Sequence, residues 1–270
     1  MNNVGIHEMV SRRDHPESPS RQTGIDGAVV PRLEAYESMV AIARQRFDQH
    51  PASRALFYDP IDPITLQEFL IAFAVVGIRM TEPVEGWIRR AGNRCGELGL
   101  EELAKALAAH ARQEADHHLL MLADARILVE QWNRAHKPEL NLDVLLKQPA
   151  TCGVDAYVSL HERLIAGSTP YGQLAVEYEI ERLSVTYGPR LIERCVGALG
   201  ENIRAGLGFL TDHVALDAGH TNFNRLQLGR LLDEHPDFLP GLIRAGSEAL
   251  DAYVTFLGDC LTFLRSSPLL

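Results

Sequence analysis

The stretch from His213 to His220 carries three metal-binding side chains at a spacing that suits one face of a helix. His213, Asp217 and His220 stand at positions i, i+4 and i+7, so an α-helix would align them over two turns. Apolar neighbours, among them Phe209 and Leu216, border this stripe, which favours a place beside the core over a solvated face. Imidazole and carboxylate ligands in this pattern suit a transition metal.

Glu114 and His117 form a second pair of candidate ligands, at i and i+3 in a stretch expected to be helical. This E-x-x-H unit recurs in bundles that hold two metal ions between carboxylates. The alternative is that Glu114 and His117 lie on a salt-bridged helix surface and bind no metal. His118, at i+4 from Glu114, is a rival ligand. His110 and Asp124 lie on the same stripe and are candidates for orienting the ligands through hydrogen bonds.

Glutamates elsewhere in the chain supply the remaining candidate carboxylates. Glu177 and Glu181 share a helix face, whereas Glu179 is expected to point away into solvent. Glu181 is the preferred ligand and Glu177 its alternative. Glu82 is a further candidate, because it stands as far before the first motif as Glu181 stands before the second. Its alternative role is to complement a helix dipole.

The elements that must position these residues are predicted to be helices. Beyond residue 30, helix formers dominate and β-branched alternation is scarce, so the fold class is all-α, with about seven or eight helices. Thr65 and Glu68 form a capping-box pattern, and Pro83 would kink or restart the helix that follows. Residues 51–63 contain three prolines and are expected to be a loop. Helices are expected over residues 32–50, 65–94 with the kink or restart at Pro83, 100–135, 141–148, 152–167, 170–198, 201–233 and 238–265.

Composition narrows the classes of partner. The 270 residues carry a net charge of −10, which argues against nucleic acid and anionic membranes, since both need clustered Lys and Arg. No run reaches the roughly 18 continuous apolar residues of a membrane span. Residues 1–30 are polar and are expected to be a flexible tail without a secretory signal. The four cysteines are far apart and indicate free thiols in a cytoplasmic protein.

Taken together, the two motifs resemble those of the haem-oxygenase-like diiron oxidases and oxygenases. The segment from His110 to Asp124 is similar to the H-x-x-E-E-x-G-H-x-x-L-L-x-x-D pattern of that superfamily, and His213 to His220 is similar to its H-x-x-x-D-x-x-H pattern. Glu181 takes the place of the glutamate on the intervening helix. Two departures stand in the first motif, where Asp116 replaces a frequent Gly and Gln113 a frequent Glu.

The resemblance covers about residues 65–235 and implies one haem-oxygenase-like bundle over residues 31–270. It implies two Fe(II) ions, O2 as co-substrate and a small amino-acid- or amine-like substrate. N-oxygenation is the favoured reaction, with oxidative C–C cleavage or desaturation next, in natural-product biosynthesis. An external electron donor and a homodimer are compatible with this expectation. The implied metal ligands are Glu114, His117, Glu181, His213, Asp217 and His220, with Glu82 as an additional member.

Two other functions stay open at this point. One is a metal-free member of the same fold, a hydrolase or a cofactor-less oxidase that acts on a small heterocycle; metal content after expression in iron-rich medium discriminates it. The other is a helical binding or scaffold protein without catalysis. That function predicts that Glu114, His117 and Asp217 tolerate replacement by Ala with no loss of metal or ligand affinity.

Overall fold

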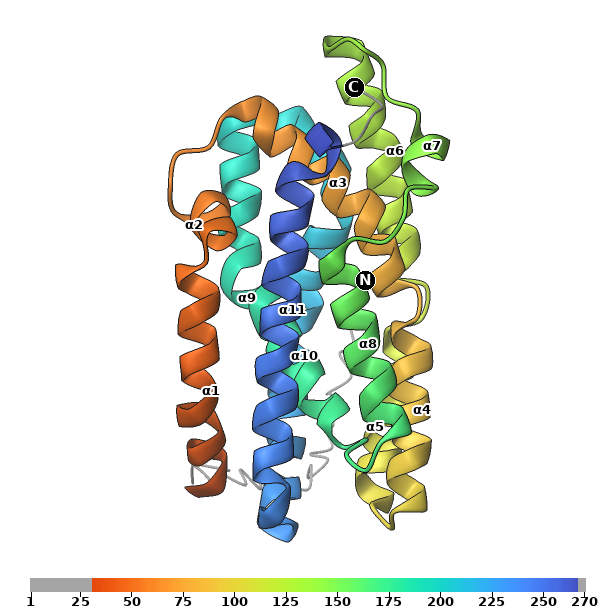
Figure 1. The fold of residues 1–270 in the computed structure, drawn as a ribbon, viewed down its shortest axis with the longest axis vertical. Coiled ribbons are helices and arrows are strands. Elements are labelled where there is room, and N and C mark those ends of the chain that lie inside the picture. The colour runs from red at the N-terminus through yellow and green to blue at the C-terminus, as the bar shows by residue number, and fades with distance from the viewer. Residues whose placement is uncertain (1–30, 267–270) are drawn as a thin grey trace, which may run out of the picture.

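A computed structural model describes residues 31–266, and this part of the chain contains helices and no strand (Figure 1). The all-α prediction is therefore confirmed, whereas the predicted N-terminal tail lies outside the described residues. The α-helices are α1 (Pro31–Gln49), α2 (Pro51–Phe57), α3 (Pro63–Thr81), α4 (Val84–Glu97), α5 (Glu101–Gln113), α6 (His118–Ala135), α7 (Leu142–Leu146), α8 (Cys152–Ala166), α9 (Gly172–Leu199), α10 (Gly208–Glu234) and α11 (Leu239–Ser266), with short 3-10 helices at Glu201–Gly206 and Pro236–Phe238.

The described residues contain more helices than the expected seven or eight, because α2 lies in a predicted loop and the predicted helices over residues 65–94 and 100–135 are each two helices. Helix α2 occupies the predicted proline-rich loop: Pro51 stands in its first turn, and the His50 ring accepts the N–H of Ala52. Helix α3 begins earlier than predicted, because the N-cap is Asp62, whose carboxylate accepts the N–H of Thr65 at 2.9 Å.

The predicted helix over residues 100–135 is wrong in one respect: it is two helices, α5 and α6, separated by a turn. Asp116 in this turn has φ of 66°, a left-handed conformation that no helix interior contains. The turn holds Glu114 and His117. The spacing of these two residues is therefore not the helical i, i+3 spacing that the sequence suggests.

The bundle is organised around α11, which packs on α1, α3, α8 and α9 (Figure 1). Helix α10 lies along α9, α5 along α4, and α6 along α3. Where α8 meets α11, a Cβ on Gly153 would lie 2.2 Å from the backbone nitrogen of Phe256, so only glycine permits this close approach. These contacts bring α5, α6, α9 and α10, which carry both motifs and Glu181, to one side of the core.

Glu179 corrects a further expectation, because it is buried and not solvated. Its side chain is 1% exposed. Arg44 of α1 donates to both carboxylate oxygens, from Nε at 2.8 Å and Nη2 at 2.6 Å, and the Tyr36 hydroxyl donates at 3.0 Å. The prediction that Glu179 is solvated is wrong because the sequence does not show that α1 covers this face of α9.

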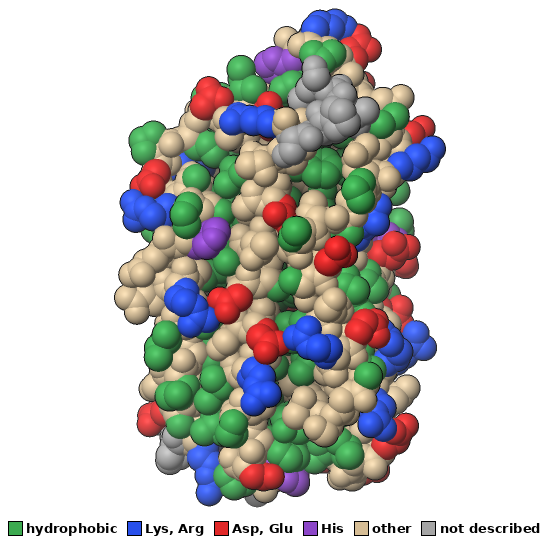
Figure 2. Space-filling model, in the orientation of Figure 1, with side chains coloured by type: hydrophobic (Ala, Val, Ile, Leu, Met, Phe, Trp, Pro, Cys, Tyr) green, Lys and Arg blue, Asp and Glu red, His purple; other side chains and the backbone are tan. Residues whose placement is uncertain are grey.

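The surface mixes both signs of charge. Figure 2 shows Lys and Arg side chains scattered among Asp and Glu over the face in view, not gathered in one patch. Within the described residues, one stretch is long and apolar enough to cross a membrane, Pro63–Glu97, spanning α3 and α4. Its most apolar window is 67% buried inside the bundle, as in the core helix of a soluble protein.

Candidate metal centre

Two groups of side chains converge at the junction of α5, α6, α9 and α10. In the first, His110, Glu114, Glu181 and His220 each offer one ligand atom, and these atoms lie within 4.8 Å of one another. In the second, Glu114, His117 and His213 do the same. Glu114 belongs to both groups, so the two candidate metal-binding groups share one carboxylate.

The two oxygens of Glu114 face the two groups separately. Its Oε1 lies 3.4 Å from Nδ1 of His220 and 3.5 Å from Nε2 of His110. Its Oε2 lies 2.9 Å from Nδ1 of His117. A carboxylate that presents one oxygen to each of two sets of ligands can bridge two metal ions.

The turn between α5 and α6 places Glu114 in this position. Because α5 ends at Gln113 and α6 begins at His118, Glu114 and His117 lie on short, non-helical backbone. The left-handed Asp116 stands where the resembled superfamily often has Gly, the residue that adopts this conformation at least cost. Asp is one of the few other residues that tolerate this conformation, so the replacement is compatible with the turn.

His110 is the ligand candidate that sequence reasoning missed. It was expected to orient other ligands, but its Nε2 lies 2.9 Å from Oε1 of Glu181 and belongs to the first group. The signal was present: His110 precedes Glu114 by four residues, one helical turn. The spacing does not predict a ligand role for His110, because it does not show that a turn follows α5.

Asp217 lies beside the groups but in neither of them. It is buried, and its Oδ1 lies 3.5 Å from Nδ1 of His220. Glu177 is also buried and points to the same cavity, and its carboxylate accepts a hydrogen bond from Nε2 of Gln173. His118 is the first residue of α6 and joins neither group.

Glu82 is not brought to the site. It caps the C-terminal end of α3, its side chain is exposed, and it lines none of the cavity around the two groups. The equal sequence intervals that suggested it therefore do not correspond to equal positions in space. The neighbours of Glu82 in the chain, Thr81 and Val84, line the cavity, so the backbone passes beside the site while the exposed Glu82 side chain does not reach it.

Neighbouring groups hold several of these side chains in place. Nδ1 of His213 lies 2.9 Å from the carbonyl oxygen of Phe209; an N–H at Nδ1 donates to it and leaves Nε2 free to bind a metal. Asn224 donates to Oε2 of Glu181 at 2.7 Å. Asp124 touches no ligand, but its carboxylate accepts the N–H groups of Gly208 and Phe209 and so caps α10 from another helix.

Several buried polar atoms in the groups make no hydrogen bond within the described residues, although most lie at ion-pair distance from another member of the groups. Nδ1 and Nε2 of His110, Nδ1 of His117, Nδ1 of His220 and Oε1 of Glu181 are buried and make no hydrogen bond there. Unpartnered buried polar atoms are costly and rare in native proteins. All five atoms belong to residues of the two groups. Four of them, all except Nδ1 of His110, lie within 3.4 Å of an oppositely charged atom of another member, and bound metal ions would take the place of these contacts.

The ionisable side chains of the site shift one another's pKa. Burial lowers the pKa of His110, but the adjacent Glu114 and Glu181 outweigh burial and raise it to about 10. Burial raises the pKa of Glu114, yet His110 and His117 hold it well below its usual range. Glu177 has a pKa raised to about 8, chiefly by burial. Without metal, protonated histidines therefore neutralise the carboxylates, and metal binding must displace those protons.

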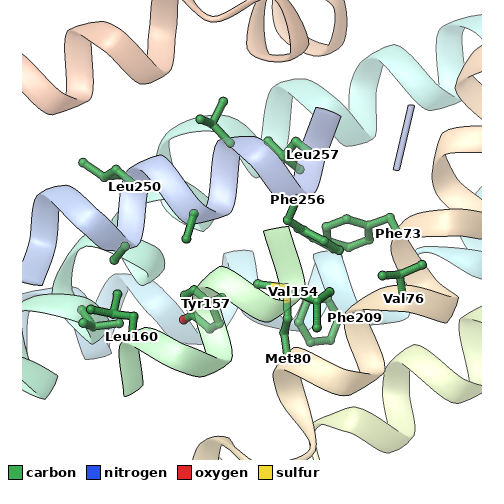
Figure 3. Close-up of a cluster of buried hydrophobic side chains, with 14 of the residues drawn as sticks. Phe73, Val76, Met80, Val154, Tyr157, Leu160, Phe209, Leu250, Phe256 and Leu257 are labelled. Carbon is green, nitrogen blue, oxygen red and sulfur yellow. The ribbon is translucent and has the colours of Figure 1, made fainter. Parts of the chain in front are cut away.

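A cavity of about 80 Å³ opens beside the two groups. Its wall includes six ionisable side chains and is otherwise largely apolar; the six are Glu114, His117, Glu177, Glu181, His213 and Asp217. Figure 3 shows Met80, Tyr157, Phe209 and Phe256 of that wall within the cluster of buried hydrophobic side chains.

Comparisons with known proteins support the fold. No protein-family model matches the chain, and no curated protein does. Among solved structures, the chain is similar to a domain of unknown function with a haem-oxygenase-like fold from Shewanella denitrificans. The likeness covers 88% of this chain and 95% of that domain, with a TM-score of 0.69 and 12% sequence identity. The haem-oxygenase-like fold predicted from the sequence is therefore confirmed.

Proposed function

We propose that this haem-oxygenase-like bundle is a non-haem diiron enzyme that uses O2 to oxidise a small molecule. Fold alone does not set function, so the proposal rests on the site. The observation that carries it is the position of the Glu114 carboxylate, whose two oxygens face two separate groups of buried ligand atoms that make no hydrogen bond.

The residues present fit two iron ions. Glu114, His117 and His213 form a set of two histidines and one carboxylate, the ligand set of many Fe(II) oxygenases. The other ion would be held by His110, Glu114, Glu181 and His220, and Asp217 is near enough to His220 to contribute a further carboxylate. When bound, two Fe(II) ions would supply the electrons and the open coordination positions for reaction with O2.

The chain's own part is to position ligands and to keep water out. The hydrogen bond from His213 to the Phe209 carbonyl fixes the imidazole tautomer, and Asn224 fixes the Glu181 carboxylate. The apolar wall of the cavity limits water around the reacting groups. Buried Glu177 lies in the same cavity, where it can exchange a proton with substrate.

We further propose an amine-like substrate, with N-oxygenation favoured over C–C cleavage or desaturation, and an external electron donor that restores Fe(II). A place in natural-product biosynthesis follows from the resemblance of the two motifs. The four carboxylates around the cavity are compatible with a substrate that carries a positive charge.

The test is an anaerobic titration with Fe(II), followed by rapid mixing with O2. The proposal predicts about two Fe per chain, as a two-metal site requires, and a transient visible absorption that the iron-free protein does not give. An Arg89→Ala variant, altered at an exposed position away from the cavity, is the matched control and keeps both responses. Absence of iron binding would reject the proposal and favour a metal-free enzyme of the same fold.

A further inference from the structure

Trp87 connects the cavity beside the candidate metal ligands to the protein surface. Its indole ring meets the Tyr157 ring edge-on, with centroids 6.1 Å apart, and Tyr157 lines the cavity. The indole N–H donates to Oε1 of Glu162 at 2.9 Å. The Glu162 carboxylate, which is half-exposed, accepts from both Nη atoms of Arg90, at 2.6 and 3.0 Å. One buried indole and one tyrosine ring therefore lie between the cavity and a surface ion pair.

The surroundings of Trp87 favour the loss of an electron from its ring. A carboxylate on the indole N–H stabilises positive charge on the indole, and it can take up the indole proton, which becomes strongly acidic once an electron has left. Hydrogen bonds from Arg90 lower the pKa of Glu162, so this carboxylate is ionised at neutral pH. The His161 ring stacks on the indole, with centroids 4.1 Å apart. Burial lowers the pKa of His161 to about 4, so this neighbour is neutral and does not oppose the charge.

The other tryptophan of the chain, Trp132, provides an internal reference. Its indole N–H donates to the carbonyl oxygen of Pro138 at 3.4 Å, an acceptor that cannot take up the proton. Neither Trp132 nor the His136 ring that it contacts lines the cavity. Trp132 is 5% exposed and Trp87 is 1% exposed, so exposure to solvent would not make Trp87 the more reactive of the two.

We propose that Trp87 is a redox-active residue that supplies an electron to the oxidised metal centre when no substrate is bound. This rests on the proposed function, in which iron that has reacted with O2 is the oxidant. Trp87 loses one electron, its N–H bond breaks, the proton moves to the Glu162 carboxylate, and the electron reduces the metal centre. The Tyr157 ring bridges the two and keeps its phenol proton. A one-electron reductant in solution, such as ascorbate, then returns an electron to Trp87, and Glu162 returns the proton.

The first experiment looks for the radical. Full-length protein loaded with Fe(II) is mixed with O2 without substrate, and freeze-quenched samples are measured by electron paramagnetic resonance. A neutral indolyl radical is expected, with a spectrum that narrows when ring-deuterated tryptophan is incorporated. Trp87→Phe should abolish this signal, and the matched control Trp132→Phe should keep it. A tryptophan signal that survives Trp87→Phe would overturn the proposal.

The role of Glu162 is tested in the same way. Glu162→Gln keeps an acceptor oxygen for the indole N–H but cannot take up its proton, and its half-exposed position tolerates the change. The radical yield should fall several-fold in this variant. A yield equal to that of wild type would overturn the assignment of Glu162 as the proton acceptor.

The second experiment locates lasting damage by peptide mass spectrometry after repeated exposure of the iron-loaded protein to O2. Oxygen should be added to Trp87 several-fold more than to Trp132, and ascorbate should suppress this modification. In Trp87→Phe the damage should move to Tyr157 and to the histidine ligands, with a loss of bound iron. Equal modification of both tryptophans in wild type would overturn the proposal.

A measurement without iron separates failure of the proposal from failure of the diiron function. A ruthenium complex, photo-oxidised in solution, takes an electron from the metal-free protein, and the radical should form at Trp87 in preference to Trp132. That preference in a chain that binds no iron would keep Trp87 as the redox-active residue and remove the diiron function. Two irons and a transient absorption with O2, without a Trp87 radical, would remove this proposal and leave the diiron function standing.

Discussion

Oε2 of Glu114 lies 2.9 Å from Nδ1 of His117, although the two residues do not share a helix. The contact is made by the turn between α5 and α6, in which Asp116 has a positive φ. The local backbone of this turn therefore determines whether Glu114 can face both groups of ligands.

The conformation of Asp116 gives a prediction about stability. Asp116→Val should lower the free energy of unfolding by about 1–2 kcal/mol, because the left-handed backbone conformation is energetically more unfavourable for a β-branched residue. Asp116→Gly should stay within about 1 kcal/mol of wild type, since relief of strain is offset by greater freedom of the unfolded chain. Urea unfolding of the metal-free variants measures both. Equal stability of the Val variant and wild type would contradict the described turn.

His110 should be a ligand of one ion only, because it belongs to the first group and not the second. His110→Ala is expected to reduce iron binding from two ions per chain to one, measured by anaerobic titration. His118→Ala is the matched control, a histidine on the next helix that joins neither group, and should keep two. Two irons in the His110 variant would show that this residue only orients its neighbours.

Asp124 should affect the site through the start of α10. Asp124→Ala removes the acceptor for two backbone N–H groups and should cost about 1 kcal/mol of unfolding free energy, the usual value for a lost cap. Iron in the group that contains His213 should also bind more weakly. Asp124→Asn, which keeps an acceptor oxygen, should lose less of both. Identical behaviour of the Ala and Asn variants would argue against a capping role.

His161 should make the metal-free protein less stable in mild acid. Burial lowers its pKa to about 4, whereas the unfolded chain takes up the proton near the ordinary value of 6.5. The unfolded state therefore binds more protons between these values, and stability falls as pH falls through that window, by about 2 kcal/mol from pH 7 to pH 5. The His161 ring stacks on the Trp87 ring, with centroids 4.1 Å apart. His161→Phe keeps a ring that can stack there but cannot take up a proton, so it should reduce that loss of stability. An unchanged loss would assign the acid sensitivity to other groups.

Much of the fold could be read from the sequence, because helical periodicity marks each long helix and the paired motifs identify the bundle. Most of the ligand candidates also come together as expected. Those that failed depend on tertiary contacts. Glu179 is predicted to be solvated because nothing in the local sequence shows that α1 covers it. Glu82 is predicted as a ligand from equal sequence intervals, but these do not fix the direction of its side chain, which is exposed although Thr81 and Val84 beside it line the cavity. His110 is not predicted as a ligand, because the end of α5 depends on the backbone conformation of the turn that follows it and is not visible in the residue spacing.

The central claim is that Glu114 is shared by two metal ions, and counting bound iron in Glu114→Ala tests it most directly. The account predicts that this single substitution abolishes tight binding of both ions, because the residue supplies one oxygen to each group. His110→Ala and His213→Ala, each altered in one group, should retain one ion. A Glu114→Ala protein that folds, as judged by its circular dichroism, and still binds two Fe(II) per chain would contradict the account.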